Sequence, residues 1–293
     1  MIKKLKRIFK SSIPQQKVNL LVHSPWVGDS SRAILVEKLA FLSQDYGWNM
    51  KVTRHPIEFG ELLMSKLIPT AIVVMNDIRP IEIYLDMASD QGIPIIGMGS
   101  MDCPYLTASV SSNNASMARE SAAYLAAETK GEIVIIGSNA HPMIYERELV
   151  AKFEFATHSH IEVSQTLDYD SSLGHQILKK KLADVIKSDK GEQISGVWSA
   201  WDRPTLVITK MIDKLGYSER IKVAGVDGTK GTLALLKSSR SLIATSAQDL
   251  DGIAQRVAHL VSIKTERLSP DLPHIQLPAR LHTKSDLLED LSI

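Results

Sequence analysis

Short β-branched runs alternate with helical patterns along this chain, and the alternation restricts its fold more than any other feature. The predicted strands are residues 17–23, 51–54, 70–75, 93–98, 132–137, 162–167, 196–201 and 222–227, and the predicted helices are residues 31–46, 57–66, 80–91, 115–129, 145–156, 173–188 and 205–215. A strand–helix–strand rhythm indicates a parallel sheet covered by helices on both faces. Because the rhythm fills two stretches of similar length, we expect an α/β protein of two Rossmann-like lobes.

Composition agrees with such a fold and excludes several classes of protein. The chain has 293 residues, 44% of them hydrophobic, which is enough for more than one core. It carries 34 basic and 33 acidic residues, so nothing suggests a nucleic-acid-binding surface. A single cysteine, Cys103, excludes an internal disulfide framework and a site of several thiolates.

The first ten residues, MIKKLKRIFK, resemble the charged start of a secretory signal. The polar sequence SSIPQQ follows them instead of an apolar run, and we expect residues 1–16 to form a basic, disordered leader. No stretch is long and apolar enough to span a membrane. This segment therefore leaves both export and a cytoplasmic location open.

Catalytic and cofactor motifs are weak. Gly97 and Gly99 form a lone GxG without the third glycine of a dinucleotide loop, and there is no GxSxG elbow. His158 and His160 lie two positions apart and could in principle bind a metal, although exposed loop histidines are the more usual interpretation. The sequence therefore predicts no cofactor, no metal and no enzymatic activity.

Aromatic and polar residues at predicted strand ends give the clearest functional signal. They are Trp26, Tyr169, Trp201, Asp227 and Gln248. Ligands of open α/β sheets lie beyond the carboxyl ends of the strands, where these residues fall. Aromatic rings stack on sugars or cations, and carboxylates and amides bind hydroxyls. We expect Trp201 to line a cleft, whereas strand alternation places Trp198 in the core and Trp48 in a packing position.

Several segments carry a family resemblance, and two of them match best: AGVDGT at 224–229 and ATSAQ at 244–248. The others are SPW at 24–26, IPIIGM at 93–98, SVSSNNASMARESAAYL at 109–125, SQTLDYD at 164–170 and SAWDRPTLVITKMI at 199–212. Together they resemble type I periplasmic binding proteins of the ribose/galactose-binding branch, which shares its fold with LacI-type repressor ligand domains. The resemblance covers nearly the whole chain from Lys17.

The resemblance implies two lobes joined by a three-strand hinge that close on a small ligand. It implies an N-terminal lobe of residues 17–112 plus 248–276 and a C-terminal lobe of residues 113–247 plus 277–293, with crossovers near Asn113, Ala247 and Leu277. A monomer that delivers its ligand to an ABC permease, or to a membrane sensor, is the implied partner arrangement. The family location is the periplasm.

Carried over by position, the resemblance implies a set of ligand-binding residues: Trp26, Arg147, Tyr169, Trp201, Asp227 and Gln248, with Asp102 as a substitute for the family's acid. Trp26 and Tyr169 would sandwich the ligand. Arg147 would donate a fork of hydrogen bonds, and Asp227 would accept from two hydroxyls. The alternative for Arg147 is a surface arginine that pairs with Glu146 or Glu148.

Departures from the family pattern bear on the ligand. Gly99 and Ser100 stand where the family has an Asp-Arg pair, Trp201 replaces an asparagine, and the hinge reads Ser112-Asn113-Asn114. A sugar remains the default, and a less polar or cationic solute is the alternative. A cytoplasmic ligand-sensing regulator without a DNA-binding part is the second functional reading, and an α/β enzyme is the third.

Overall fold

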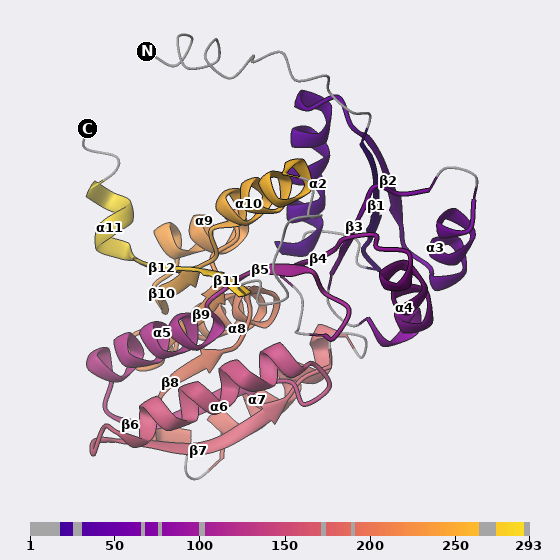
Figure 1. Ribbon diagram of the computed structural model, residues 1–293. Helices are drawn as coiled ribbons and strands as arrows, with labels where there is room; N and C mark the ends of the chain where they lie inside the picture. The colour runs from indigo at the N-terminus through magenta and orange to yellow at the C-terminus, as the bar shows by residue number, and fades with distance from the viewer. Residues whose placement is uncertain are drawn as a thin grey trace. The chain divides into compact units, whose positions relative to one another are not determined.

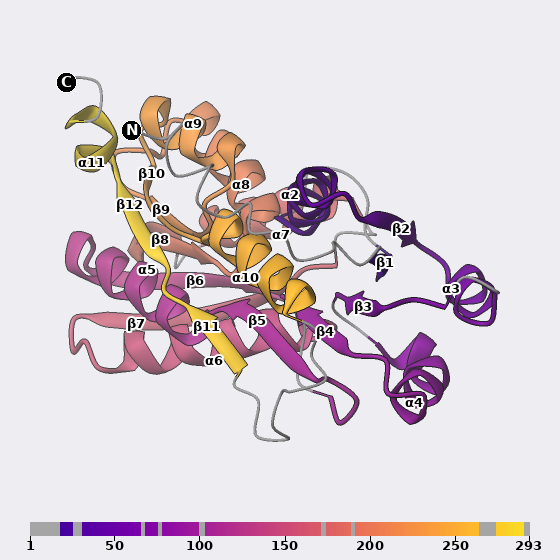
Figure 2. The ribbon, with the colours of Figure 1, turned by 45° about the horizontal axis from the view of Figure 1, so that its top comes forward.

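The computed structural model describes residues 18–25, 31–65, 68–75, 78–99, 103–170, 174–188, 191–263 and 274–289. Its strands form two six-stranded sheets, with the orders β11-β5-β4-β3-β1-β2 and β12-β10-β9-β8-β6-β7 (Figures 1 and 2). By their internal contacts the residues divide into two compact units. Two parallel-sheet units with covering helices confirm the predicted fold class.

The first sheet contains β1 (Asn19–His23), β2 (Asn49–Thr53), β3 (Ala71–Val74), β4 (Ile95–Met98), β5 (Ala108–Ser112) and β11 (His274–Leu277). β1 pairs in parallel with β2 and β3, and β3 with β4. The helices of the first unit are α3 (Pro56–Leu63), η1 (Arg79–Ile81), α4 (Glu82–Asp90) and most of α2 (Ser31–Asp45) and α10 (Leu250–Ser262). Phe59, Leu63 and Leu85 pack with Ile72 and Val74 in its core.

The second sheet contains β6 (Gly131–Gly137), β7 (Ile161–Asp168), β8 (Ile194–Ser199), β9 (Lys222–Asp227), β10 (Leu242–Ala247) and β12 (Arg280–Thr283). The neighbours from β7 to β10 all pair in parallel, and β12 runs antiparallel to β10. Since the paired strands point the same way, the carboxyl ends of β6 to β10 share one edge of the sheet.

Helices cover both faces of this second sheet. They are α5 (Asn114–Glu128), α6 (Pro142–Ala156), α7 (His175–Ile186), α8 (Asp202–Leu215) and α9 (Lys230–Ser238), and the shorter η3 (Gly191–Gln193) and α11 (Lys284–Glu289) belong to the same unit. Ile133 and Ile135 pack with α5 and α6, whereas Val134 and Ile136 pack with α7, α8 and α9. The alternate residues of one strand thus enter two separate cores, as expected of a strand buried on both faces.

Most predicted elements are present with shifted ends. The helix predicted at 80–91 is divided into η1 and α4, and Gly92, with φ +69°, follows its end as a C-cap glycine. Asn113 caps α5, since its side chain accepts the Ser116 backbone N–H at 2.8 Å. None of the helices in the described ranges is long and apolar enough to cross a membrane.

Candidate functional site

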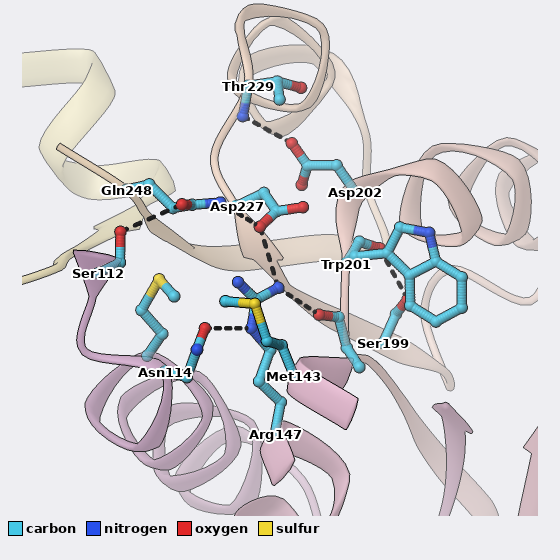
Figure 3. Close-up of polar contacts among 12 residues, drawn as sticks. Ser112, Asn114, Met143, Arg147, Ser199, Trp201, Asp202, Asp227, Thr229 and Gln248 are labelled. Carbon is cyan, nitrogen blue, oxygen red and sulfur yellow. Dashed lines mark hydrogen bonds and ion pairs between the residues drawn. The ribbon is translucent and has the colours of Figure 1, made fainter. Parts of the chain in front are cut away.

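The carboxyl edge of the second sheet gathers polar side chains from several elements (Figure 3). Asp227 is the last residue of β9, Gln248 follows β10, and Asp202 opens α8 after β8. Arg147 reaches the same edge from α6. The shared strand direction brings together residues that are far apart in the sequence.

Arg147 is the centre of this cluster. Its side chain is buried, with the residue 5% exposed, and its Nη1 donates to Asp227 Oδ1 at 3.0 Å. The same Nη1 donates to the Ala200 carbonyl at 2.9 Å, and Nε donates to Asn114 Oδ1 at 2.9 Å. The alternative prediction of a surface arginine that pairs with Glu146 or Glu148 is therefore wrong, because α6 turns Arg147 inward toward the sheet edge.

Asp227 has an unusual backbone. Its φ of 107° makes it the one non-glycine residue with positive φ in the described part of the chain. Gly228 follows with φ +62°, and a Cβ added there would lie 2.2 Å from Ala247 Cβ. Backbone strain of this kind persists only where the surroundings hold it, and it concentrates at functional sites. The turn after β9 is thus locked against the end of β10.

Gln248 also holds the Asp227 carboxylate in place through hydrogen bonds. Its Nε2 donates to Asp227 Oδ1 at 2.6 Å, and its backbone N–H donates to the Asp227 carbonyl at 3.1 Å. Its own Oε1 accepts from Ser112 Oγ at 3.1 Å. Asp227 Oδ1 therefore receives two donors, from Arg147 and Gln248, and its orientation is set before any ligand arrives.

Asp202 belongs to the same edge but was not among the predicted binding residues. It is 5% exposed, and its Oδ2 accepts the Thr229 backbone N–H at 2.6 Å. Its Oδ1 is buried without a hydrogen-bond partner among the described residues. Burial, together with repulsion from the Asp227 carboxylate, raises the pKa of this carboxyl to about 7.

Two aromatic residues of the predicted set stack on each other. The rings of Tyr169 and Trp201 lie 5.7 Å apart between centroids, at an interplanar angle of 18°. Tyr169 is 3% exposed, and its hydroxyl lies 2.6 Å from His175 Nδ1. Trp201 is half-buried and packs against both cores of the second unit. Trp198 is fully buried and donates to Ser121 Oγ, which confirms its predicted place in the core.

The seven predicted binding residues thus fall into three groups. Arg147, Asp227 and Gln248 are in direct contact, and Tyr169 and Trp201 form a separate stack. Trp26 and Asp102 lie outside the described residues. The roles of all seven in ligand binding remain predictions.

Other parts of the second unit are weaker candidates for a ligand-binding or metal site. A surface hollow of about 940 Å³ lies at the opposite, amino-terminal edge of the sheet, where side chains of both charges, such as Glu132, Glu219 and Lys222, surround it. Among the described residues no group of histidine, cysteine and acidic side chains has a geometry suited to a metal. His158 Nε2 pairs with Glu154, and His160 Nε2 lies 2.9 Å from the Ala126 carbonyl.

Comparison with known proteins identifies the family. Residues 69–263 match the model of the periplasmic binding protein domain, and the chain belongs to this family, which is one of binding proteins and not of enzymes. The resemblance noted in the sequence is therefore confirmed. No curated protein sequence matches the chain.

Solved structures share the fold at low sequence identity. An ABC transporter solute-binding protein from Agrobacterium vitis with bound allitol is 18% identical, with a TM-score of 0.78 over 94% of this chain and 99% of that one. A relative from Actinobacillus succinogenes with bound D-allose is 16% identical, with a TM-score of 0.78 over 93% and 99%. One from Bacillus halodurans with bound myo-inositol is 21% identical, with a TM-score of 0.76 over 96% and 99%.

Proposed function

We propose that the protein is a solute-binding protein that closes on a small, neutral, hydroxyl-rich ligand, a sugar or a polyol. One observation carries this proposal. Arg147 Nη2 and Asp227 Oδ2 have no hydrogen-bond partner among the described residues, although Nη1 and Oδ1 of the same side chains are joined. A fixed donor thus stands beside a fixed acceptor, and neighbouring hydroxyls both accept and donate.

The charge of the cluster supports a neutral ligand. Its charged side chains are the guanidinium groups of Arg147 and Arg32, on which the Asp227 carboxylate acts, and the carboxyls of Asp202 and Asp227. The Arg147 guanidinium is hydrogen-bonded to Asp227, so it is not an unpaired cation of the kind that binds an anion. The solved relatives point the same way, since allitol, D-allose and myo-inositol are all uncharged.

We also propose that the ligand is delivered to the membrane subunits of an ABC transporter from the periplasm. The family description and the names of the solved relatives support this assignment. Two alternatives to this transport role are delivery of the ligand to a membrane sensor and ligand sensing by a cytoplasmic regulator. Release of the protein by osmotic shock together with loss of solute uptake on deletion would favour transport.

Ligand binding is tested by thermal unfolding and calorimetry with allitol, D-allose, myo-inositol, choline and citrate as probes. We expect at least one polyol to raise the unfolding temperature, since a ligand present at one hundred times its Kd stabilises by about 2.7 kcal/mol. The variant Asp227→Asn should lose this shift, whereas Asp249→Asn, at the exposed start of α10, should keep it. A shift by choline alone, or none by any probe, contradicts the neutral-polyol assignment.

A further inference from the structure

Asp202 links two helix starts beside the proposed binding residues. It is the first residue of α8, and its Oδ2 holds the backbone N–H of Thr229, the N-cap residue of α9. Thr229 stands two positions after Asp227, in the turn that is locked against Ala247. Asp202 therefore supports the backbone that orients the Asp227 carboxylate but does not itself contact Arg147 in the described network (Figure 3).

The second oxygen of Asp202 sets it apart from an ordinary helix-capping aspartate. Oδ1 is buried and lacks a hydrogen-bond partner among the described residues. The charged side chain that acts on Asp202 is Asp227 on β9, which repels it, while the backbone N–H of Thr229 supplies a hydrogen bond without charge. A buried carboxylate beside a like charge and without a cation favours its protonated form.

We propose that Asp202 is a positioning residue of the binding site whose carboxyl group takes up a proton when a neutral ligand binds. A ligand over Asp227 displaces water, and the repulsion between the two carboxylates then grows because the local dielectric falls. The proton held by Asp202 relieves this repulsion. This inference rests on the proposed function. It adds that the charge of the ligand decides whether ligand affinity rises or falls with pH.

The direction in which ligand affinity changes with pH follows from the linkage between ligand binding and proton binding. A neutral ligand that raises the pKa of Asp202 binds together with a proton, so its affinity increases as the pH falls from about 8 to 6, by at most about tenfold per pH unit. A cationic ligand stabilises the carboxylate instead, so its affinity would increase as the pH rises. The pH profile thus discriminates between the two ligand classes that the sequence left open.

The first measurement needs no ligand. The pKa of Asp202 is raised to about 7 in the folded state, above its value in the unfolded chain. The contribution of Asp202 to stability is therefore lost as the pH rises from the unfolded-state pKa toward 7. In thermal unfolding between pH 5 and pH 8, we expect the wild type to lose several degrees relative to Asp202→Asn, whose amide oxygen still accepts the Thr229 N–H. A constant difference between the two proteins across this range would overturn the proposal.

Asp213 on the same helix gives the matched control. Burial raises the pKa of its carboxyl, but hydrogen bonds from Ser239 and Ser241 outweigh burial and lower the pKa overall. Asp213→Asn should therefore differ from the wild type by the same amount at every pH between 5 and 8. A pH trend in Asp213→Asn equal to that of Asp202→Asn would show that the effect is not specific to Asp202.

The second measurement determines how many protons the protein takes up when it binds a ligand. Calorimetry with allitol, D-allose and myo-inositol as probes, in buffers of low and high ionisation enthalpy near pH 7.5, should show net proton uptake by the wild type. Asp202→Asn, whatever affinity it keeps for the same probe, should bind it without proton uptake. Uptake by both proteins, or by neither, contradicts the proposal. If none of the three probes binds, the proposed function fails, and the ligand-free measurement still decides the role of Asp202.

Discussion

Arg147 Nη1 lies 3.0 Å from Asp227 Oδ1, although eighty positions separate the two residues in the chain. Both side chains are almost excluded from solvent, with 6% and 11% of their surface exposed. The pair is held on both sides, since Asn114 fixes the guanidinium and Gln248 fixes the carboxylate. Such a pair orients donors and acceptors in advance, which lowers the entropic cost of binding.

Removal of Arg147 should be costly for the fold as well as for binding. Arg147→Met leaves Asp227 without the cation to which it is hydrogen-bonded, and breaking a buried pair in this way costs about 3 to 5 kcal/mol of unfolding free energy. Urea unfolding of the full chain measures the loss. Arg119→Met is the control, because Arg119 is 61% exposed and lies 4.0 Å from Glu154, so its removal should change stability by less than about 1 kcal/mol. Equal losses in the two variants contradict the central role of Arg147.

Gly228→Ala should disrupt the turn that carries Asp227. The added Cβ would meet Ala247 at 2.2 Å, and the residue has φ +62°. We expect a destabilisation of about 2 to 4 kcal/mol, from overpacking together with the left-handed backbone. Gly216→Ala isolates the backbone contribution, since Gly216 has φ +79° with no atom within 4 Å of its added Cβ. It should cost about 1 to 2 kcal/mol. A larger loss at Gly216 than at Gly228 would show that the contact with Ala247 is unimportant.

Trp201 should report ligand binding by fluorescence. It is half-buried at the carboxyl end of β8, whereas Trp198 is enclosed in the core and Trp48 stacks on Tyr46 in the first unit. In a Trp26→Phe background, which removes the other tryptophan predicted to contact the ligand, a bound polyol should still change the emission, and the added change Trp201→Phe should remove most of this signal. Trp48→Phe should keep it. If Trp201→Phe retains the full signal, the ligand is not near this stack.

Closure on the ligand should be visible in solution. Small-angle scattering of the full chain should give a smaller radius of gyration with a saturating polyol than without it, because hinge closure compacts a two-lobed protein. Asp227→Asn should show no change at the same polyol concentration. An unchanged radius in the wild type, at a concentration where calorimetry shows saturation, would contradict closure.

The fold was predictable because strands buried on both faces leave a clear apolar signal. β6 and β9 were predicted within a residue of their ends, because isoleucine and valine runs end in glycine or aspartate. The helix after β6 begins three residues earlier than predicted, at Pro142. β5 was missed as a separate strand. Its sequence, ASVSS, is mostly polar although nearly all of it is buried, and only tertiary pairing makes it a strand.

The residues of the site that stand at strand ends could be predicted from the sequence. The residue whose role depends on contacts with distant parts of the chain could not. Asp227 and Gln248 stand at the ends of two strands, so their position alone marked them. Asp202 reads as an ordinary acidic residue at a helix start. What makes it unusual is the Thr229 N–H, twenty-seven positions away, and an oxygen that nothing in the described residues satisfies. Neither property is encoded near Asp202 itself.

The contact of Gly228 with Ala247 restricts how this chain can acquire a new ligand in evolution. Since the backbone of the turn has no room to move, a descendant that recognises a different molecule must do so by exchanging side chains around an unchanged main chain. The resemblance described in the sequence analysis implies that Trp201 is one such exchange, with an aromatic ring at a position where the family pattern has an amide. New specificities should therefore arise through a few point substitutions and rarely through insertions at this edge.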